Sequence, residues 1–185
     1  VTICNIPMAI VAILNNKIPC HCSSILLKRQ IGVVLFMAEK GVGKSTTAFL
    51  ANNCLDYEIF GDDMVTIERL NGNIYAYQGS SRIKVCKDLA ELFNLDNKKD
   101  DIYQGVDKCY YTPKNLCSNY DRVHLNNIFI LERGSEIKIE RVSPYFYKSF
   151  LCKNIVGIDI IQGVLIKEIS AILNNLKISS MFKLI

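Results

Sequence analysis

The segment 38–46, AEKGVGKST, combines residue types that bind phosphate groups. Gly41 and Gly43 allow the backbone to curl so that successive N–H groups point at an anion. Lys44 adds a positive charge for the β- and γ-phosphates of a nucleotide, and the Ser45 hydroxyl can bind Mg²⁺. The sequence therefore predicts a site for a nucleoside triphosphate. Its predicted binding residues are Lys40, Gly41, Val42, Gly43, Lys44, Ser45 and Thr46.

The first position of this loop departs from the usual phosphate-loop pattern, which opens with glycine, because Ala38 stands there. The surrounding sequence favours the phosphate loop, since the segment follows an apolar run and opens a helical one. The alternative is a glycine-bearing loop with a chance Lys-Ser pair.

Two adjacent carboxylates, Asp62 and Asp63, follow the loop, the first of them 18 residues after Lys44. If the strand before them runs parallel to the strand before the loop, both emerge at the sheet edge where ligands bind. One carboxylate could then hold Mg²⁺ while its neighbour accepts a proton from an attacking hydroxyl. The alternative is an ordinary turn that caps the strand.

The elements that would position these groups form a strand–loop–helix–strand unit. Residues 33–37 are a short apolar run of the kind found in a strand that is covered on both faces. A helix is predicted over 45–55 and a second strand over 57–60.

The rest of the chain predicts strands first and helix last. Asn71-Gly72 between 64–69 and 74–77 indicates a hairpin, and 82–85 adds a strand. We expect a short helix over 88–93, mostly loop over 94–119, and a second hairpin from 128–131 and 137–142. Helix is expected from 145 to the end. An apolar stripe at helical spacing supports it: Ile158, Ile161, Leu165, Ile169, Ile172, Leu173 and Leu176.

Composition excludes several classes of protein. The 185 residues are 50% hydrophobic, which excludes a disordered chain, and the net charge of +4 is scattered rather than gathered in a basic stripe. We therefore expect no nucleic-acid partner.

The apolar run 6–14 is nine residues long, and a membrane span needs about 20. Eight cysteines with no predicted signal peptide favour reduced, packed thiols in the cytoplasm over disulfides or a zinc site.

Among proteins with such a loop, three classes lack their marks here. There is no N-K-x-D sequence for reading guanine, no LSGGQ-like signature of an ABC ATPase, and no arginine-rich lid of a small-metabolite kinase.

At this point the chain resembles the HPr serine kinase family, including shorter members from lasso-peptide biosynthesis clusters. The resemblance covers residues 21–144 and rests on four blocks and the residues Ile18-Pro19-Cys20-His21 before them. The blocks are EKGVGKSTTAFL, FGDDMVTIE, YAYQGSSRIKV and IFILERGSEIKIERVSP. It implies an α/β phosphate-loop core related to phosphoenolpyruvate carboxykinase, with a mixed twisted sheet, flanking helices and β-hairpins.

The resemblance also implies roles for single residues. Lys44 and Ser45 match the family's phosphate lysine and Mg²⁺ hydroxyl. Asp62 matches the catalytic acid or base that activates the acceptor serine, and Asp63 the residue near the metal. His21 is similar to a histidine near the phosphates, and a histidine bonded in a crevice is the alternative.

Two arginines complete the comparison with the family. Arg82 resembles an arginine that contacts phosphate or acceptor, and a surface or structural salt bridge is equally open. Arg133, in the LERG segment, is expected to be structural.

The function expected from these residues is an ATP- and Mg²⁺-dependent kinase acting on a hydroxyl. The acceptor would be a serine of a peptide or small protein, either HPr-like or a lasso-type precursor. We expect a single domain over 1–185 with a core over 18–144, too short for the extra N-terminal domain of full HPr kinases. A nucleotide-binding subunit without transfer activity, a plain ATPase and a homo-oligomer stay open.

Overall fold

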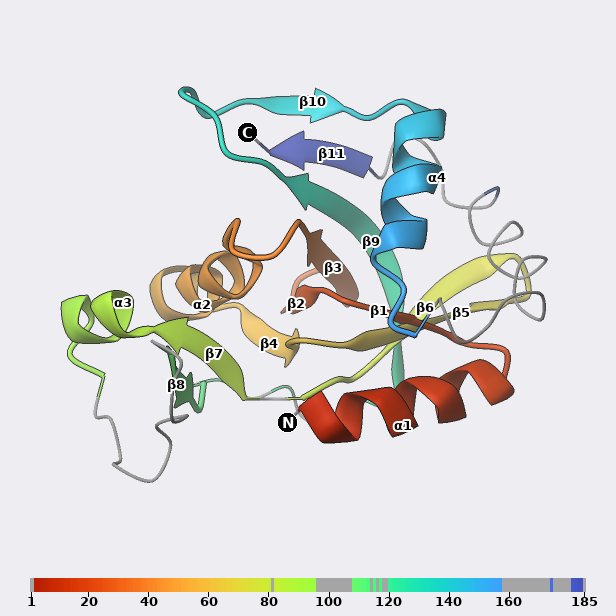
Figure 1. The fold of residues 1–185 in the computed structure, drawn as a ribbon, viewed down its shortest axis with the longest axis horizontal. Coiled ribbons are helices and arrows are strands. Elements are labelled where there is room, and N and C mark those ends of the chain that lie inside the picture. Colours follow the sequence, from red (N-terminus) through yellow and green to blue (C-terminus); the bar gives the residue numbers. More distant parts are fainter. Residues whose placement is uncertain are drawn as a thin grey trace.

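The fold is taken from a computed structural model, which describes residues 2–80, 82–95, 108–113, 115, 117, 120–157, 174 and 181–184 (Figure 1). The helices are α1 (Thr2–Leu14), α2 (Lys44–Leu55), α3 (Lys87–Leu92) and α4 (Pro144–Lys153). The first strands are β1 (Ile18–Cys20), β2 (Ser23–Leu27), β3 (Gly32–Met37), β4 (Glu58–Gly61), β5 (Val65–Leu70) and β6 (Asn73–Tyr77). The later strands are β7 (Ile83–Cys86), β8 (Lys108–Tyr111), β9 (Arg122–Leu131), β10 (Ile139–Arg141) and β11 (Met181–Leu184).

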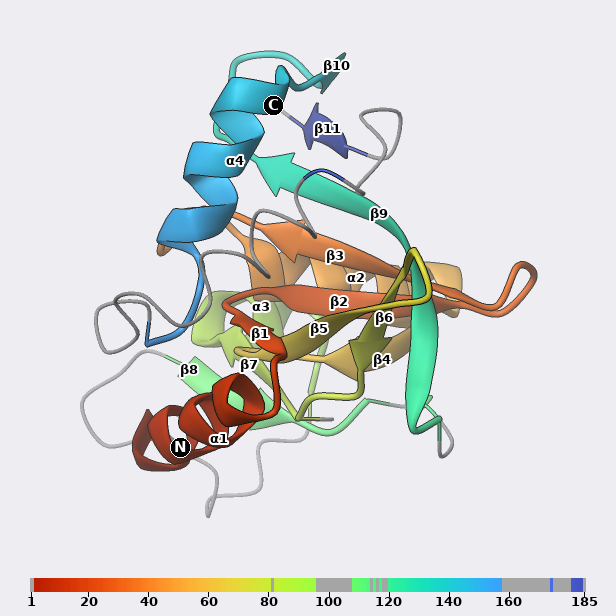
Figure 2. The same ribbon diagram turned by 90° about the vertical axis from the view of Figure 1, so that its right-hand side faces the viewer.

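The main sheet is mixed and has the order β1-β5-β6-β9-β3-β2-β4, with β11 added beside β9. β3 and β9 are parallel, whereas β2 is antiparallel to both of its neighbours, β3 and β4. Since β3 and β4 both oppose β2, they run in the same direction. Their carboxyl ends therefore lie on either side of the start of β2, as Figure 2 lets the reader follow.

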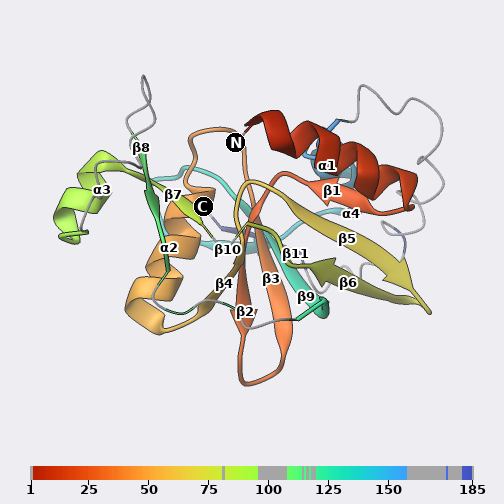
Figure 3. The same cartoon turned by 90° about the horizontal axis from the view of Figure 1, so that it is seen from below.

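Helices cover both faces of this sheet (Figure 3). Alternate residues of β3 are buried on opposite sides, so that Val33 and Leu35 join the core that includes Ile13 of α1 and Leu151 of α4. Val34 and Phe36 join a second core with Phe49 of α2. The continuous apolar run of β3 is therefore explained by burial on both faces, as its sequence predicts.

The strand–loop–helix–strand unit is confirmed by β3, α2 and β4, and the Asn71-Gly72 hairpin by β5 and β6. The prediction of mostly loop over 94–119 is wrong at β8. This strand pairs with β7 in a separate two-stranded sheet whose residues Ile83 and Val85 pack into the α2 core. Because β7 is buried against α2, its main-chain groups need a partner strand, and β8 from the polar segment 94–119 provides it. Local sequence does not reveal this pairing.

The predicted hairpin from 128–131 and 137–142 is also wrong. β9 is much longer than expected, and β11 from the end of the chain lies between β9 and β10 and pairs with both. The main-chain groups of β9 and β10 are thus satisfied by a distant strand rather than by each other.

The expected helix from 145 to the end is confirmed only at α4 and is replaced by strand at β11. The apolar stripe over 158–176 lies outside the described residues except for position 174, which is helical. No helix in the described part of the chain is long and apolar enough to cross a membrane.

Candidate functional site

Three strand ends meet at one edge of the sheet and bring the predicted site residues together. The loop after β3 leads into α2, Asp62 directly follows β4, and Ser23 begins β2. In the register, Ser23 lies opposite Phe36 near the end of β3, and Ser24 lies opposite Gly61 at the end of β4. The expected placement of both aspartates at the carboxyl edge is therefore what the fold shows.

The loop between β3 and α2 uses both glycines in conformations that other residues rarely adopt, with φ of 84° at Gly41 and 125° at Gly43. Gly43 is the cap of α2, and no side chain caps the first N–H groups of this helix. The Lys44 ammonium folds back and donates to the carbonyl oxygens of Ala38 (2.9 Å) and Glu39 (3.4 Å). The loop thus presents N–H groups and a buried ammonium in a short arc.

Ala38 is 1% exposed and lies in the core that includes Ala48 of α2. Its carbonyl accepts from Lys44, so the alanine is compatible with a closed loop. Among the other predicted loop residues, Lys40 is exposed, and Val42 and Thr46 are partly buried.

Asp62 is only 2% exposed, and hydrogen-bond donors surround its carboxylate. Oδ1 accepts from Ser45 Oγ at 2.9 Å and from Ser23 Oγ, and Oδ2 accepts from the backbone N–H of Lys84 at 3.1 Å. Burial raises the pKa of Asp62, although the hydrogen bonds from Ser23 and Lys84 act in the opposite direction. A buried carboxyl with a raised pKa holds its proton more tightly than an exposed one, which is a feature of candidate acid–base groups.

Asp63 takes a different set of partners from Asp62. Its φ of 66° lies in the left-handed region, and its carboxylate forms an ion pair with Lys84. Burial would lower the pKa of Lys84, but the hydrogen bond and charge of Asp63 outweigh it and raise that pKa. Ser45 contacts Asp62 rather than Asp63, so the predicted metal pair of Ser45 and Asp63 is not joined by a direct hydrogen bond.

His21 lies beside this pair. Its Nδ1 is 2.9 Å from the carbonyl oxygen of Asp63, which can only accept, so Nδ1 carries the proton. Burial and the nearby charge of Lys44 lower the pKa of His21, which favours the neutral ring with Nε2 as its acceptor atom.

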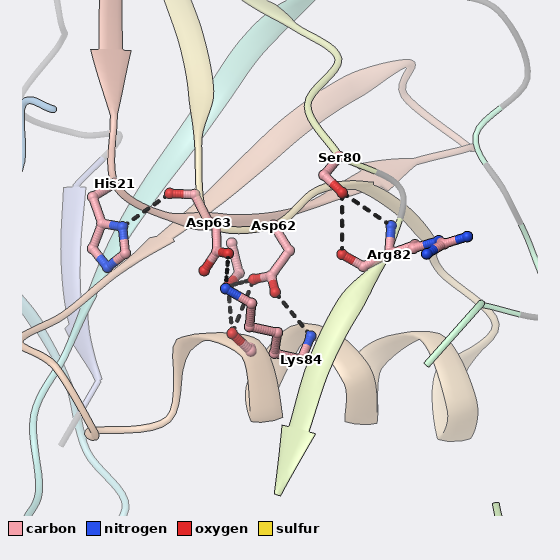
Figure 4. A network of polar contacts seen from close by, with 8 residues as sticks. His21, Asp62, Asp63, Ser80, Arg82 and Lys84 are labelled. Carbon is pink, nitrogen blue, oxygen red and sulfur yellow. Dashed lines mark hydrogen bonds and ion pairs between the residues drawn. The ribbon is translucent and has the colours of Figure 1, made fainter. Parts of the chain in front are cut away.

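The two arginines differ in what they contact. Arg82 is exposed, its backbone bonds Ser80, and Figure 4 shows its guanidinium directed away from Asp62 and Asp63. The side chain of Arg133, expected to be structural, donates to the Gly41 carbonyl at 3.0 Å and so touches the loop itself.

Sequence reasoning missed Ser23 and Lys84. Ser23 is the second residue after His21, and its Oγ lies 3.4 Å from that of Ser45. Lys84 is the polar residue between Ile83 and Val85 in a predicted strand, and only the fold shows that it faces the aspartates (Figure 4). The alternation of apolar and polar residues in this strand could have predicted which face of the strand Lys84 occupies, but not that it lies beside Asp63.

Any metal at this edge would need hydroxyl and phosphate oxygens as well as carboxylates. In the part of the chain that the structure describes, no group of three or more His, Cys, Asp or Glu side chains is close enough to hold an ion. The seven cysteines whose side chains the structure describes form no disulfide with one another, and burial raises the pKa of Cys20 to about 12 and that of Cys117 to about 11.

Comparison with solved structures gives distant matches only at the level of fold. No protein-family model and no curated protein matches the sequence. Among solved structures, the chain is similar to the HPr(Ser) kinase/phosphatase from Coxiella burnetii, at 15% identity over 67% of this chain and 77% of that one. The TM-score is 0.40, which describes a distant similarity of chain path and carries no conclusion about activity.

Proposed function

We propose that this chain binds Mg-ATP at the loop between β3 and α2 and transfers the γ-phosphate to a hydroxyl group. The observation that carries the proposal is the 2.9 Å hydrogen bond from Ser45 to Asp62, which joins the first turn of α2 to the end of β4. A hydroxyl and a carboxylate beside a glycine loop and a buried lysine are the groups that a metal–phosphate complex needs.

The oxygen donors present fit Mg²⁺, which prefers hard oxygen ligands and is usually bound by few protein groups together with phosphate. The Ser45 hydroxyl donates a hydrogen bond to Asp62, so the lone pairs of the Ser45 oxygen are left for an ion. Asp63, the residue after Asp62, supplies a second carboxylate. Bound there, the ion would neutralise charge on the phosphates. We propose Ser45 and Asp63 as its protein ligands.

The protein groups then have distinct roles. The α2 N–H groups and Lys44 bind and orient the phosphates, and Asp62 takes the proton of the acceptor hydroxyl. Two hydroxyl groups fill Oδ1 of Asp62, whereas Oδ2 accepts one backbone N–H and keeps a second lone pair for the acceptor hydroxyl. Neutral His21 orients the backbone of Asp63 and can accept a hydrogen bond through Nε2.

The acceptor class rests on the resemblance to HPr serine kinases. We propose a serine in a peptide or small protein, either HPr-like or a lasso-type precursor, and a cytoplasmic setting in which the thiols stay reduced. We further propose that Arg82, whose side chain is exposed, contacts such an acceptor rather than the nucleotide.

A second candidate, a nucleotide-binding subunit without transfer activity, is favoured by one observation. Asp62 is almost fully buried, so an outside hydroxyl reaches it only if the site opens.

The two candidates are separated by incubating serine peptides with Mg-ATP and measuring their mass. The kinase adds one HPO₃ unit to an acceptor. The Asp62→Asn variant should bind ATP within about threefold of wild type yet lose at least about 100-fold in transfer. The control is Ser24→Ala, because Ser24 lies next to Ser23 but bonds the Gly61 carbonyl instead. Transfer that survives in Asp62→Asn would remove the assigned role.

A further inference from the structure

Lys84 contacts both aspartates of the site from one position on β7. Its backbone N–H donates to Oδ2 of Asp62 at 3.1 Å, and its ammonium group pairs with the carboxylate of Asp63. In Figure 4 the side chain extends from the strand toward the aspartates.

Two adjacent carboxylates need such a partner. Asp62 is buried, and the charge of Asp63 adds to the effect of burial in raising the pKa of Asp62. A nucleotide would bring further negative charge to the same edge. An ammonium group at Asp63 reduces this repulsion and fixes the direction of the carboxylate.

The fold delivers Lys84 to this place with little freedom. Its neighbours Ile83 and Val85 are fully buried against α2, so alternation along β7 turns the Lys84 side chain to the opposite face. Lys84 is paired in register with Tyr110 of β8, whose ring centroid lies 5.9 Å from the ammonium nitrogen. The side chains of Lys84 and Asp63 are 25% and 22% exposed, so this pair is better shielded from water than an ordinary surface pair.

We propose that Lys84 is a positioning residue of the phosphoryl transfer, holding Asp62 through its N–H and Asp63 through its ammonium group. This inference rests on the proposed function. It adds a residue from a second sheet to a site otherwise built by the main sheet, so that the β7–β8 unit controls the geometry of the aspartates.

The first test needs no nucleotide. Urea unfolding is measured for wild type, Lys84→Met, Asp63→Asn and the double variant. Because both single changes remove the same contact, the midpoint shift of the double variant should be clearly smaller than the sum of the two single shifts. Additive shifts would overturn the proposal, since the two side chains would then act independently.

The second test separates positioning from simple bracing of the strand. ADP formation from Mg-ATP is measured in the presence of the serine peptides that serve as acceptors, for wild type, Lys84→Met and Lys84→Arg. We expect Lys84→Met to lower kcat about 10- to 100-fold with KM within about threefold, and Lys84→Arg to recover most of the loss. The matched control is Lys28→Met. Lys28 lies outside the site, and its ammonium nitrogen is 3.4 Å from a carboxylate oxygen of Glu58 in β4.

Two results would overturn the role of Lys84: a Lys84→Met enzyme with kcat within about twofold of wild type, or a Lys84→Arg enzyme as slow as Lys84→Met. A wild-type chain that binds Mg-ATP but forms no ADP would overturn the transfer step and this role with it. Failure of the wild type to bind Mg-ATP at all would instead contradict the proposed function at its first step.

Discussion

At the scale of single residues, the site depends on how one buried carboxylate is satisfied. Asp62 receives two hydroxyl groups at Oδ1 and one backbone N–H at Oδ2, from three different elements. These bonds favour its charged form, but burial has the larger effect and raises its pKa. The folded protein therefore holds a carboxylate whose charge is unfavourable for stability, and we propose that its role is to accept a proton.

This balance gives a stability prediction for Asp62→Asn. The amide can accept the Lys84 N–H through its oxygen and donate to both hydroxyl oxygens through its nitrogen, so no partner is lost. Without a buried charge, the variant should be more stable than wild type by about 1 kcal/mol at pH 7.5 in metal-free buffer.

The direction in which stability changes with pH follows from the raised pKa of Asp62. The stability that a protonated Asp62 provides is complete below its unfolded value of 3.8 and is lost as pH rises through the higher folded value. The advantage of Asp62→Asn should therefore shrink between pH 7.5 and pH 4. Urea unfolding at both pH values checks this, and a wild type that is the more stable protein at pH 7.5 would contradict it.

At the scale of elements, two glycines let the segment before β7 approach the end of β4. A Cβ on Gly79 would lie 2.3 Å from the carbonyl oxygen of Met64, and one on Gly61 would lie 2.8 Å from the Cα of Gly79. This close approach allows the backbone N–H of Gly79 to donate to the carbonyl oxygen of Phe60. It also allows the backbone N–H of Asp62 to donate to the carbonyl oxygen of Ser80. Glycine at both positions thus sets the distance between Asp62 and the strand that carries Lys84.

Gly79→Ala should therefore push the two segments apart. We expect a loss of about 1–3 kcal/mol in unfolding free energy and at least about tenfold weaker Mg-ATP binding, measured by urea unfolding and calorimetry. Gly72→Ala is the control. Gly72 has φ of 80° but open space around its Cα, so alanine there should cost about 1 kcal/mol without changing nucleotide affinity. Equal effects of the two changes on affinity would contradict this view.

The elements also show what local sequence can predict. β3, α2, β4 and the β5–β6 hairpin depend on apolar runs, helical spacing and an Asn-Gly turn, all of which are local signals. β8 and β11 are strands because distant partners complete their hydrogen bonds, and no local pattern distinguishes them.

At the scale of the whole molecule, the site lies where two sheets and α2 meet. The loop residues and the aspartates could be predicted because residue type and strand order place them at one edge. Ser23 and Lys84 could not, since their contribution depends on strand register and on a small sheet that packs against α2. The contact from Arg133 to Gly41 likewise joins residues 92 positions apart.

The most direct test of the account is a calorimetric titration of the wild-type chain and Lys44→Ala with ATP in the presence of Mg²⁺. Lys44 is 9% exposed and its ammonium lies on the loop carbonyls, and under the proposed function its removal takes away the positive charge that binds the phosphates. Lys28→Ala serves as the control, since that lysine pairs with Glu58 outside the site. We predict that Mg-ATP binds to wild type and to Lys28→Ala, and binds at least about 30-fold more weakly to Lys44→Ala. A wild-type chain that binds no Mg-ATP, or a Lys44→Ala chain that binds it as tightly as wild type, would contradict the account.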